Sequence, residues 1–138
     1  MATKKMIDLL NRAIAREMQV SIQYMWQHIL WKGVEGYVIK DQLRAIAIVE
    51  MQHAELIAER LSFFGGIPTT TPDPIFIGKT FKQMMKQDAK DEQVAIDLYK
   101  KIIAQAEKEK DSTTKKLFEN ILAEEEDHLD LFKGLMGN

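Results

Sequence analysis

The chain contains no cysteine, which excludes disulfide bonds, thiolate metal sites and cysteine nucleophiles. It has no basic excess, with 19 Lys and Arg against 21 Asp and Glu and a formal net charge of −2. No apolar run approaches the roughly 20 residues that span a membrane, and the N-terminus lacks the apolar stretch of a signal peptide. We therefore expect a cytoplasmic protein that binds neither nucleic acid nor membranes.

Proline and glycine are scarce, and their positions divide the chain. All three prolines lie within residues 68–74, and four of the seven glycines lie at positions 33, 36, 65 and 66. The long segments between them predict four helices, over residues 4–31, 38–64, 81–109 and 112–135, in a single domain spanning residues 1–138. Thr80 with Gln83 fits a capping box for the third helix, and Asp111 fits an N-cap for the fourth.

The connections between these helices differ in length, and this determines the topology. The first and third connections are short and predict antiparallel hairpins. The second has about 15 residues, which extend to roughly 50 Å and can run the length of a bundle. The second and third helices would then be parallel. Two antiparallel hairpins joined by one long crossover predict an all-α, ferritin-like four-helix bundle.

Each predicted helix carries a glutamate in the middle of its apolar stripe. In the second helix the stripe advances by alternating four- and three-residue steps, which turns both Glu50 and His53 toward the core. The fourth helix repeats this Glu-x-x-His pattern, and the first and third helices each contribute one glutamate. The core-facing polar residues are Glu17, Glu50, His53, Glu92, Glu125 and His128.

The two halves of the chain repeat the same spacing. Thirty-three residues separate the two glutamates of each hairpin, and a shift of 75 positions relates one half to the other. The shift carries Glu17, Tyr24, Glu50 and His53 onto Glu92, Tyr99, Glu125 and His128. A single Glu-x-x-His pair is most often a surface salt bridge, but two matched pairs on apolar stripes favour a functional site in the core.

Four carboxylates in one core would repel each other and lose their hydration. Two divalent cations would cancel four negative charges, so the pattern predicts a binuclear metal centre. Carboxylate oxygens with one imidazole per ion favour iron or manganese over structural zinc. We expect Glu50 and Glu125, each sharing a helical turn with a histidine, to bridge the ions.

The other ligands would each serve one ion. Glu17 and Glu92 would be terminal ligands, with His53 on one ion and His128 on the other. Tyr24 and Tyr99 would either donate hydrogen bonds to ligand carboxylates or serve as ordinary core residues.

The ligand pattern resembles the di-iron carboxylate site of ferritin-like bundles. The segments EMQHAE, with Met51 after Glu50, and ILAEEEDHLDLF resemble bacterioferritin. The resemblance covers nearly the whole chain, from REMQVSIQY through the GGIP turn to DHLD. It implies a ferroxidase that binds Fe²⁺, oxidises it with O₂ or H₂O₂ and stores the ferric product. The ligands it implies are Glu17, Glu50, His53, Glu92, Glu125 and His128.

The chain also departs from bacterioferritin. Those proteins usually continue into a fifth helix that helps to close a 24-subunit cage. Only ten residues follow His128, so we expect no fifth helix and find a dimer or smaller shell as plausible as a 24-mer. Well-studied members carry a histidine and an acid where this chain has Ala45 and Val49, which argues against an iron route there.

A second apolar stripe on the first helix predicts a homodimer or larger homo-oligomer. It comprises Met18, Ile22, Met25 and Ile29, extended by Ile48 of the second helix. Met51 lies on the same face, about 100° around the helix from Glu50. The resemblance implies that Met51 and its twofold mate ligate a haem between subunits; the alternative is that Met51 only packs.

Two alternatives to iron storage remain open. One is a ferritin-like peroxidase or manganese catalase, and the other is a non-catalytic helical bundle that binds haem or another metal. Among the remaining acids, Asp88 would guide ions or lie near solvent, and Glu124 and Glu126 would form a solvated face.

Overall fold

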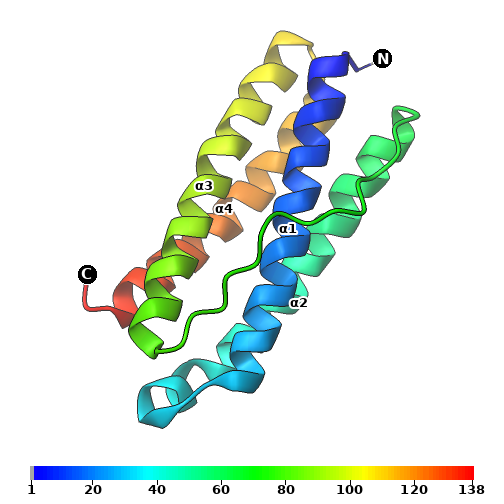
Figure 1. Ribbon diagram of the computed structural model, residues 1–138. Helices are drawn as coiled ribbons and strands as arrows, with labels where there is room; N and C mark the ends of the chain where they lie inside the picture. Colours follow the sequence, from blue (N-terminus) through cyan, green and yellow to red (C-terminus); the bar gives the residue numbers. More distant parts are fainter. Residues whose placement is uncertain (1) are drawn as a thin grey trace.

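The computed structural model describes residues 2–138, which form four α-helices and no strand. They are α1 (Lys4–Leu30), α2 (Gly33–Phe63), α3 (Phe81–Lys108) and α4 (Ser112–Leu135). Helices α1 and α2 form one antiparallel hairpin, and α3 and α4 form the other (Figure 1). Residues 64–80 connect the hairpins, so that α2 and α3 run in the same direction. The predicted all-α bundle with one long crossover is confirmed.

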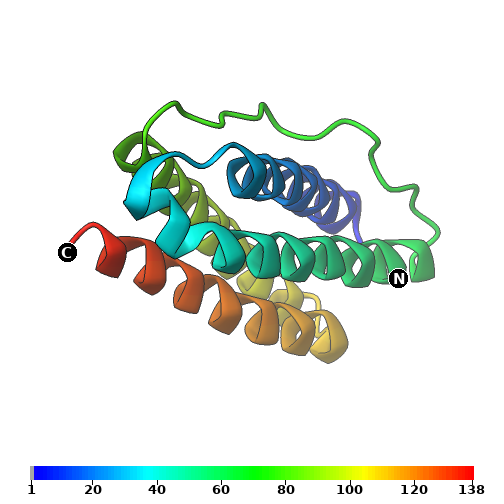
Figure 2. The same ribbon diagram turned by 90° about the horizontal axis from the view of Figure 1, so that it is seen from below.

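The crossover lies along the outside of the bundle. Figure 2 shows it passing over α1, on the side away from α4. Helix α1 packs against α2 and α3, and α4 packs against α3 and α2. None of the helices in residues 2–138 is long and apolar enough to cross a membrane.

The N-termini of α3 and α4 are capped by the residues that the sequence predicts. The Thr80 hydroxyl accepts a hydrogen bond from the Gln83 amide at 3.2 Å, and the Asp111 carboxylate accepts one from the Thr114 amide at 3.1 Å. The Gln83 side chain accepts from the Lys79 amide at 2.9 Å rather than from that of Thr80. The reciprocal half of the capping box is therefore shifted by one residue.

Helix α2 begins at Gly33, five residues before the predicted start at residue 38. Glycine disfavours helix interiors, which is why the sequence predicts a later start. Gly36 lies in the first turn of α2, and a β-carbon there would approach the Trp31 β-carbon to 3.0 Å. The missing side chain thus leaves room for Trp31 to pack across the hairpin turn. A packing requirement outweighs the poor helix propensity of glycine here.

The core consists of two apolar layers separated by a polar layer. One layer surrounds Leu10, Ile57 and Phe118, and the other surrounds Leu43, Met85 and Phe132. Burying each such side chain contributes about 1.5–3 kcal/mol. These layers offset the cost of burying the carboxylates that lie midway along all four helices.

Candidate metal centre

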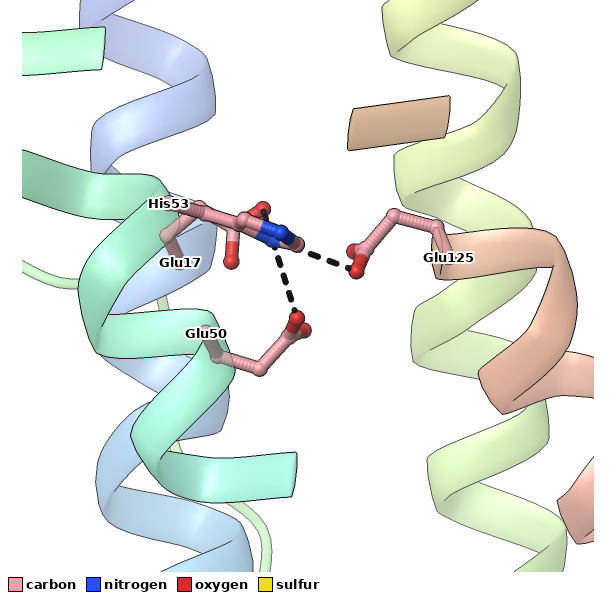
Figure 3. A group of neighbouring side chains, drawn as sticks. All are labelled: Glu17, Glu50, His53 and Glu125. Carbon is pink, nitrogen blue, oxygen red and sulfur yellow. Dashed lines mark ion pairs between the residues drawn. The ribbon is translucent and has the colours of Figure 1, made fainter. Parts of the chain in front are cut away.

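One glutamate from each helix lies in the polar layer, and none of the four is exposed to solvent. They are Glu17 of α1, Glu50 of α2, Glu92 of α3 and Glu125 of α4. Figure 3 shows Glu17 and Glu50 pointing from the first hairpin toward Glu125 of the second. The buried apolar residues elsewhere on the stripe of each helix fix the face that its glutamate presents. The four glutamates therefore converge because each lies on the apolar, core-facing stripe of its helix.

Two histidines flank the pair formed by Glu50 and Glu125. Nδ1 of His53 lies 3.2 Å from Glu50 Oε1 and 3.5 Å from Glu125 Oε1. Nδ1 of His128 lies 3.3 Å from Glu125 Oε1 and 3.5 Å from Glu50 Oε1. Each histidine also approaches one further carboxylate, Glu17 at 3.7 Å for His53 and Glu92 at 3.8 Å for His128. The two halves of the centre are thus nearly equivalent.

These six residues form two overlapping sets of metal-ligand atoms. One set is Glu17, Glu50, His53 and Glu125; the other is Glu50, Glu92, Glu125 and His128. Within each set the ligand atoms lie within 4.8 Å of one another. Glu50 and Glu125 belong to both sets, as bridging ligands must. The structure thus brings together all six residues that the sequence singles out.

Unsatisfied polar atoms are concentrated in this layer. Each of the six residues has one buried atom without a hydrogen-bond partner. These atoms are Glu17 Oε2, Glu50 Oε1, Glu92 Oε2, Glu125 Oε1, His53 Nδ1 and His128 Nδ1. Leaving a buried polar atom unsatisfied costs about 1–3 kcal/mol. Carboxylate oxygens and imidazole nitrogens gathered in this way suit iron or manganese ions.

The burial of four carboxylates shifts their protonation. Burial and repulsion from Glu125 raise the pKa of Glu17 and of Glu50. Burial also raises the pKa of Glu92, despite attraction from Arg16. Burial acts to raise the pKa of Glu125 as well, but attraction from Arg16 and the nearby imidazoles of the two histidines hold it well below its usual range. Among the four glutamates, Glu125 alone has a pKa lowered by its surroundings.

Two buried tyrosines hold the outer glutamates. The Tyr24 hydroxyl of α1 donates to Glu92 Oε1 at 2.7 Å, and the Tyr99 hydroxyl of α3 donates to Glu17 Oε1. The predicted hydrogen bonds to the candidate ligands are present, and each one crosses to the other hairpin. Each tyrosine occupies one carboxylate oxygen and leaves the other oxygen unpaired, which fixes the orientation of the carboxylate.

Two neighbouring acids make contacts that the sequence does not predict. Glu124 is exposed, as the sequence predicts, but its Oε2 also lies 2.9 Å from His53 Nε2. This contact fixes the ring with Nδ1 toward the carboxylates. Asp88 is not near solvent, because it is fully buried and accepts hydrogen bonds from Gln23 at 3.0 Å and Gln27 at 2.9 Å.

Arg16 is the functional residue that sequence reasoning misses altogether. Its side chain is buried, and Nη1 lies 2.7 Å from Glu50 Oε2 and forms an ion pair with Glu125 Oε2. Nη1 also donates to Glu17 Oε1 at 3.4 Å. Nη2 lies 3.1 Å from Glu92 Oε2, at ion-pair distance but outside hydrogen-bond geometry. One guanidinium thus contacts all four glutamates.

Comparisons with known proteins agree with this geometry. The sequence model of the ferritin-like domain family matches residues 7–138. The chain is 33% identical to the bacterioferritin of Desulfovibrio desulfuricans, over 95% of this chain and 74% of that one. It is 34% identical to the bacterioferritin of Brucella melitensis, over 94% of this chain and 81% of that one. A ferritin-like, diiron-carboxylate protein from Bacillus anthracis superposes with a TM-score of 0.94 at 26% identity, covering 98% of this chain and 99% of that one.

Proposed function

This chain belongs to the ferritin-like family, and we propose that it is a ferroxidase that oxidises Fe²⁺ for iron storage and detoxification. The observation that carries the proposal is the pair of ligand sets that share Glu50 and Glu125. Two Fe²⁺ ions would neutralise four carboxylates that otherwise repel one another in a buried layer.

Each ligand has a distinct role in this proposal. Glu50 and Glu125 would hold both ions, because their oxygens belong to both sets. Glu17 with His53 would complete one site, and the equivalent pair of α3 and α4, Glu92 with His128, would complete the other. Two adjacent ions can deliver two electrons together. With O₂ the balance is 2 Fe²⁺ + O₂ + 2 H⁺ → 2 Fe³⁺ + H₂O₂; with H₂O₂ it is 2 Fe²⁺ + H₂O₂ + 2 H⁺ → 2 Fe³⁺ + 2 H₂O.

The direct test is oxidation of Fe²⁺ by the purified protein. We expect a fast phase that consumes about two Fe²⁺ per chain and proceeds well above the rate in buffer. Further Fe²⁺ should yield ferric iron that stays in solution with the protein, as storage requires. An oxidation rate equal to that of buffer would contradict the proposal.

The second candidate function is a peroxidase or manganese catalase at the same centre. The observation that allows it is the ligand set itself, since carboxylates with one imidazole per ion suit manganese as well as iron. Such an enzyme would retain manganese on purification and would consume H₂O₂ without any added Fe²⁺. Metal analysis of untreated protein, combined with a peroxide assay, separates the two functions.

An apolar face on the first hairpin supports the proposal of a homo-oligomer. Ile29 of α1 and Met51 of α2 are 58% and 62% exposed, and Ile48, one turn before Met51, is also exposed. Such a face is costly in water and is commonly buried in a twofold dimer. We expect light scattering at micromolar concentration to give at least twice the mass of the 15.9 kDa chain. A monodisperse monomer would contradict this.

We also propose that Met51 ligates a haem between two subunits. Its exposed thioether and its twofold mate would offer two axial ligands to one haem between subunits. Haem added to the protein should then bind at about one per two chains, with a shifted Soret band that is lost in Met51→Leu. Unchanged spectra in that variant would leave Met51 as a packing residue.

A further inference from the structure

Arg16 pairs with carboxylate oxygens that bridging ligands would offer to metal ions. Its Nη1 contacts Glu50 Oε2 and Glu125 Oε2, which are oxygens of the two glutamates common to both ligand sets. A guanidinium has only donors and no lone pair to offer a metal. It therefore competes with a cation for these oxygens and cannot serve as a ligand.

The charge balance of the layer agrees with such a competition. Four ionised glutamates and one arginine carry a net charge of −3 when both histidines are neutral. Two divalent ions alone bring the four carboxylates to zero, whereas two ions together with Arg16 would leave one uncompensated positive charge in a buried layer. Buried charges are tolerated only when they are paired. The arrangement with two ions is therefore best balanced when the guanidinium has left.

The structure provides a space for the guanidinium to enter. A cavity of about 250 Å³ lies beside α1, with Arg16 itself in its wall. Asp73 of the crossover and Asp97 of α3 also line this cavity, together with the cationic side chains of Arg12 and Lys101. The Asp73 amide donates a 3.0 Å hydrogen bond to the Ala15 carbonyl, which fixes the crossover next to Arg16. Arg16 thus borders both the cavity and the centre.

We propose that Arg16 is an exchangeable internal cation, which pairs with the four glutamates when no metal is bound and moves into the adjoining cavity when metal ions enter. There its guanidinium can pair with the carboxylates of Asp73 and Asp97 in place of those of the centre. The proposal rests on the proposed binding of metal by the centre. It assigns Arg16 a positioning role and no catalytic one.

The proposal predicts opposite effects of one substitution on two quantities. Arg16→Leu removes the competing charge and keeps most of the apolar bulk. The metal-free variant should unfold at a lower temperature than the wild type, because four buried carboxylates lose their cation. The same variant should bind Mn²⁺ at least tenfold more tightly, because metal no longer has to displace an internal cation. If Arg16 instead stayed in place and oriented the ligand carboxylates by hydrogen bonds, Arg16→Leu would weaken Mn²⁺ binding.

The experiment is calorimetric titration of the full chain with Mn²⁺, together with thermal unfolding of the metal-free protein. Arg44→Leu is the matched control, because Arg44 is an exposed arginine of α2 that lines neither the cavity nor the centre. The control should bind Mn²⁺ as the wild type does. If metal-free Arg16→Leu does not fold, Arg16→Gln provides a neutral side chain that can still donate hydrogen bonds, with the same expected gain in affinity.

Three outcomes are distinguishable. Tighter Mn²⁺ binding in the Arg16 variant and unchanged binding in the control support the proposal. Equal or weaker Mn²⁺ binding by the folded Arg16 variants overturns it and leaves the ferroxidase proposal intact. A wild-type protein that binds neither Mn²⁺ nor Fe²⁺ overturns the proposed function, and with it the exchange of Arg16.

Discussion

Replacing Glu50 or Glu125 by alanine is expected to abolish the rapid oxidation of Fe²⁺. Each of these residues belongs to both ligand sets, so either substitution removes an oxygen donor from both ions at once. Mutating a residue that merely supports a metal ligand typically costs about 10–100-fold in affinity or activity. We therefore expect the initial rate to fall by more than about 100-fold on loss of a shared ligand.

A matched control shows whether this loss is specific. Glu126 follows Glu125 on α4 but is exposed to solvent. Glu126→Ala removes the same functional group from the same helix and should oxidise Fe²⁺ at the wild-type rate. Circular dichroism of all three variants verifies that the helices are retained. Oxidation at the wild-type rate in both Glu50→Ala and Glu125→Ala would exclude a shared centre.

Metal binding is expected to raise the melting temperature strongly. An ion present at one hundred times its dissociation constant stabilises the folded state by about 2.7 kcal/mol, so two ions contribute about 5 kcal/mol. For a domain of this size, 1 kcal/mol corresponds to about 2–6 °C, which predicts an increase on the order of 10–30 °C. Mn²⁺ is the suitable probe because it does not oxidise readily during the measurement.

The increase should be larger at pH 8 than at pH 6. Glu17, Glu50 and Glu92 have pKa values raised in the folded protein, so their protonated forms are favoured and stability declines as pH rises above the ordinary value of 4.5. His53 acts in the same direction. Its pKa is also raised, so its contribution is complete below 6.5 and is lost as pH rises toward the folded value.

Glu125 acts in the opposite direction. Its lowered pKa gives a contribution that is present above 4.5 and is lost on acidification below that value, outside the range from pH 6 to pH 8. The metal-free protein should therefore melt at a lower temperature at pH 8 than at pH 6. Metal binding is stronger at the higher pH, because the ligands must be deprotonated. Equal melting temperatures with and without Mn²⁺, or a smaller increase at pH 8, would contradict a shared site for the glutamates.

Apolar periodicity predicts that the four glutamates face the core, because it indicates which face of each helix is buried. Glu50 lies between Ile46 and His53 on that face, so its backbone position alone directs it into the core. The repeat of 75 positions identifies Tyr24 and Tyr99 as equivalent residues in the same way. Their actual partners, each on the opposite hairpin, follow from how α1 packs against α3, which spacing within one helix does not report.

Apolar periodicity does not predict that Arg16 and Glu124 contact the centre, and the reason is physical. Each is one residue before a core glutamate, so its β-carbon lies about 100° away from the buried stripe. Periodicity describes where a side chain begins, whereas these two long side chains reach back toward the centre. The carboxylate of Glu124 contacts His53 even though 52% of its side chain is exposed. A buried excess of negative charge is the signal that could have prompted a search for a nearby cation.

The measurement that tests the central claim most directly is anomalous diffraction at the iron edge, on crystals of the Fe²⁺-loaded protein. The account predicts two iron peaks in each chain, one beside Glu17 and His53 and the other beside Glu92 and His128. Glu50 and Glu125 should lie between the two peaks and contact both. A single peak, or iron bound only outside this layer, would contradict a binuclear centre formed by the four helices.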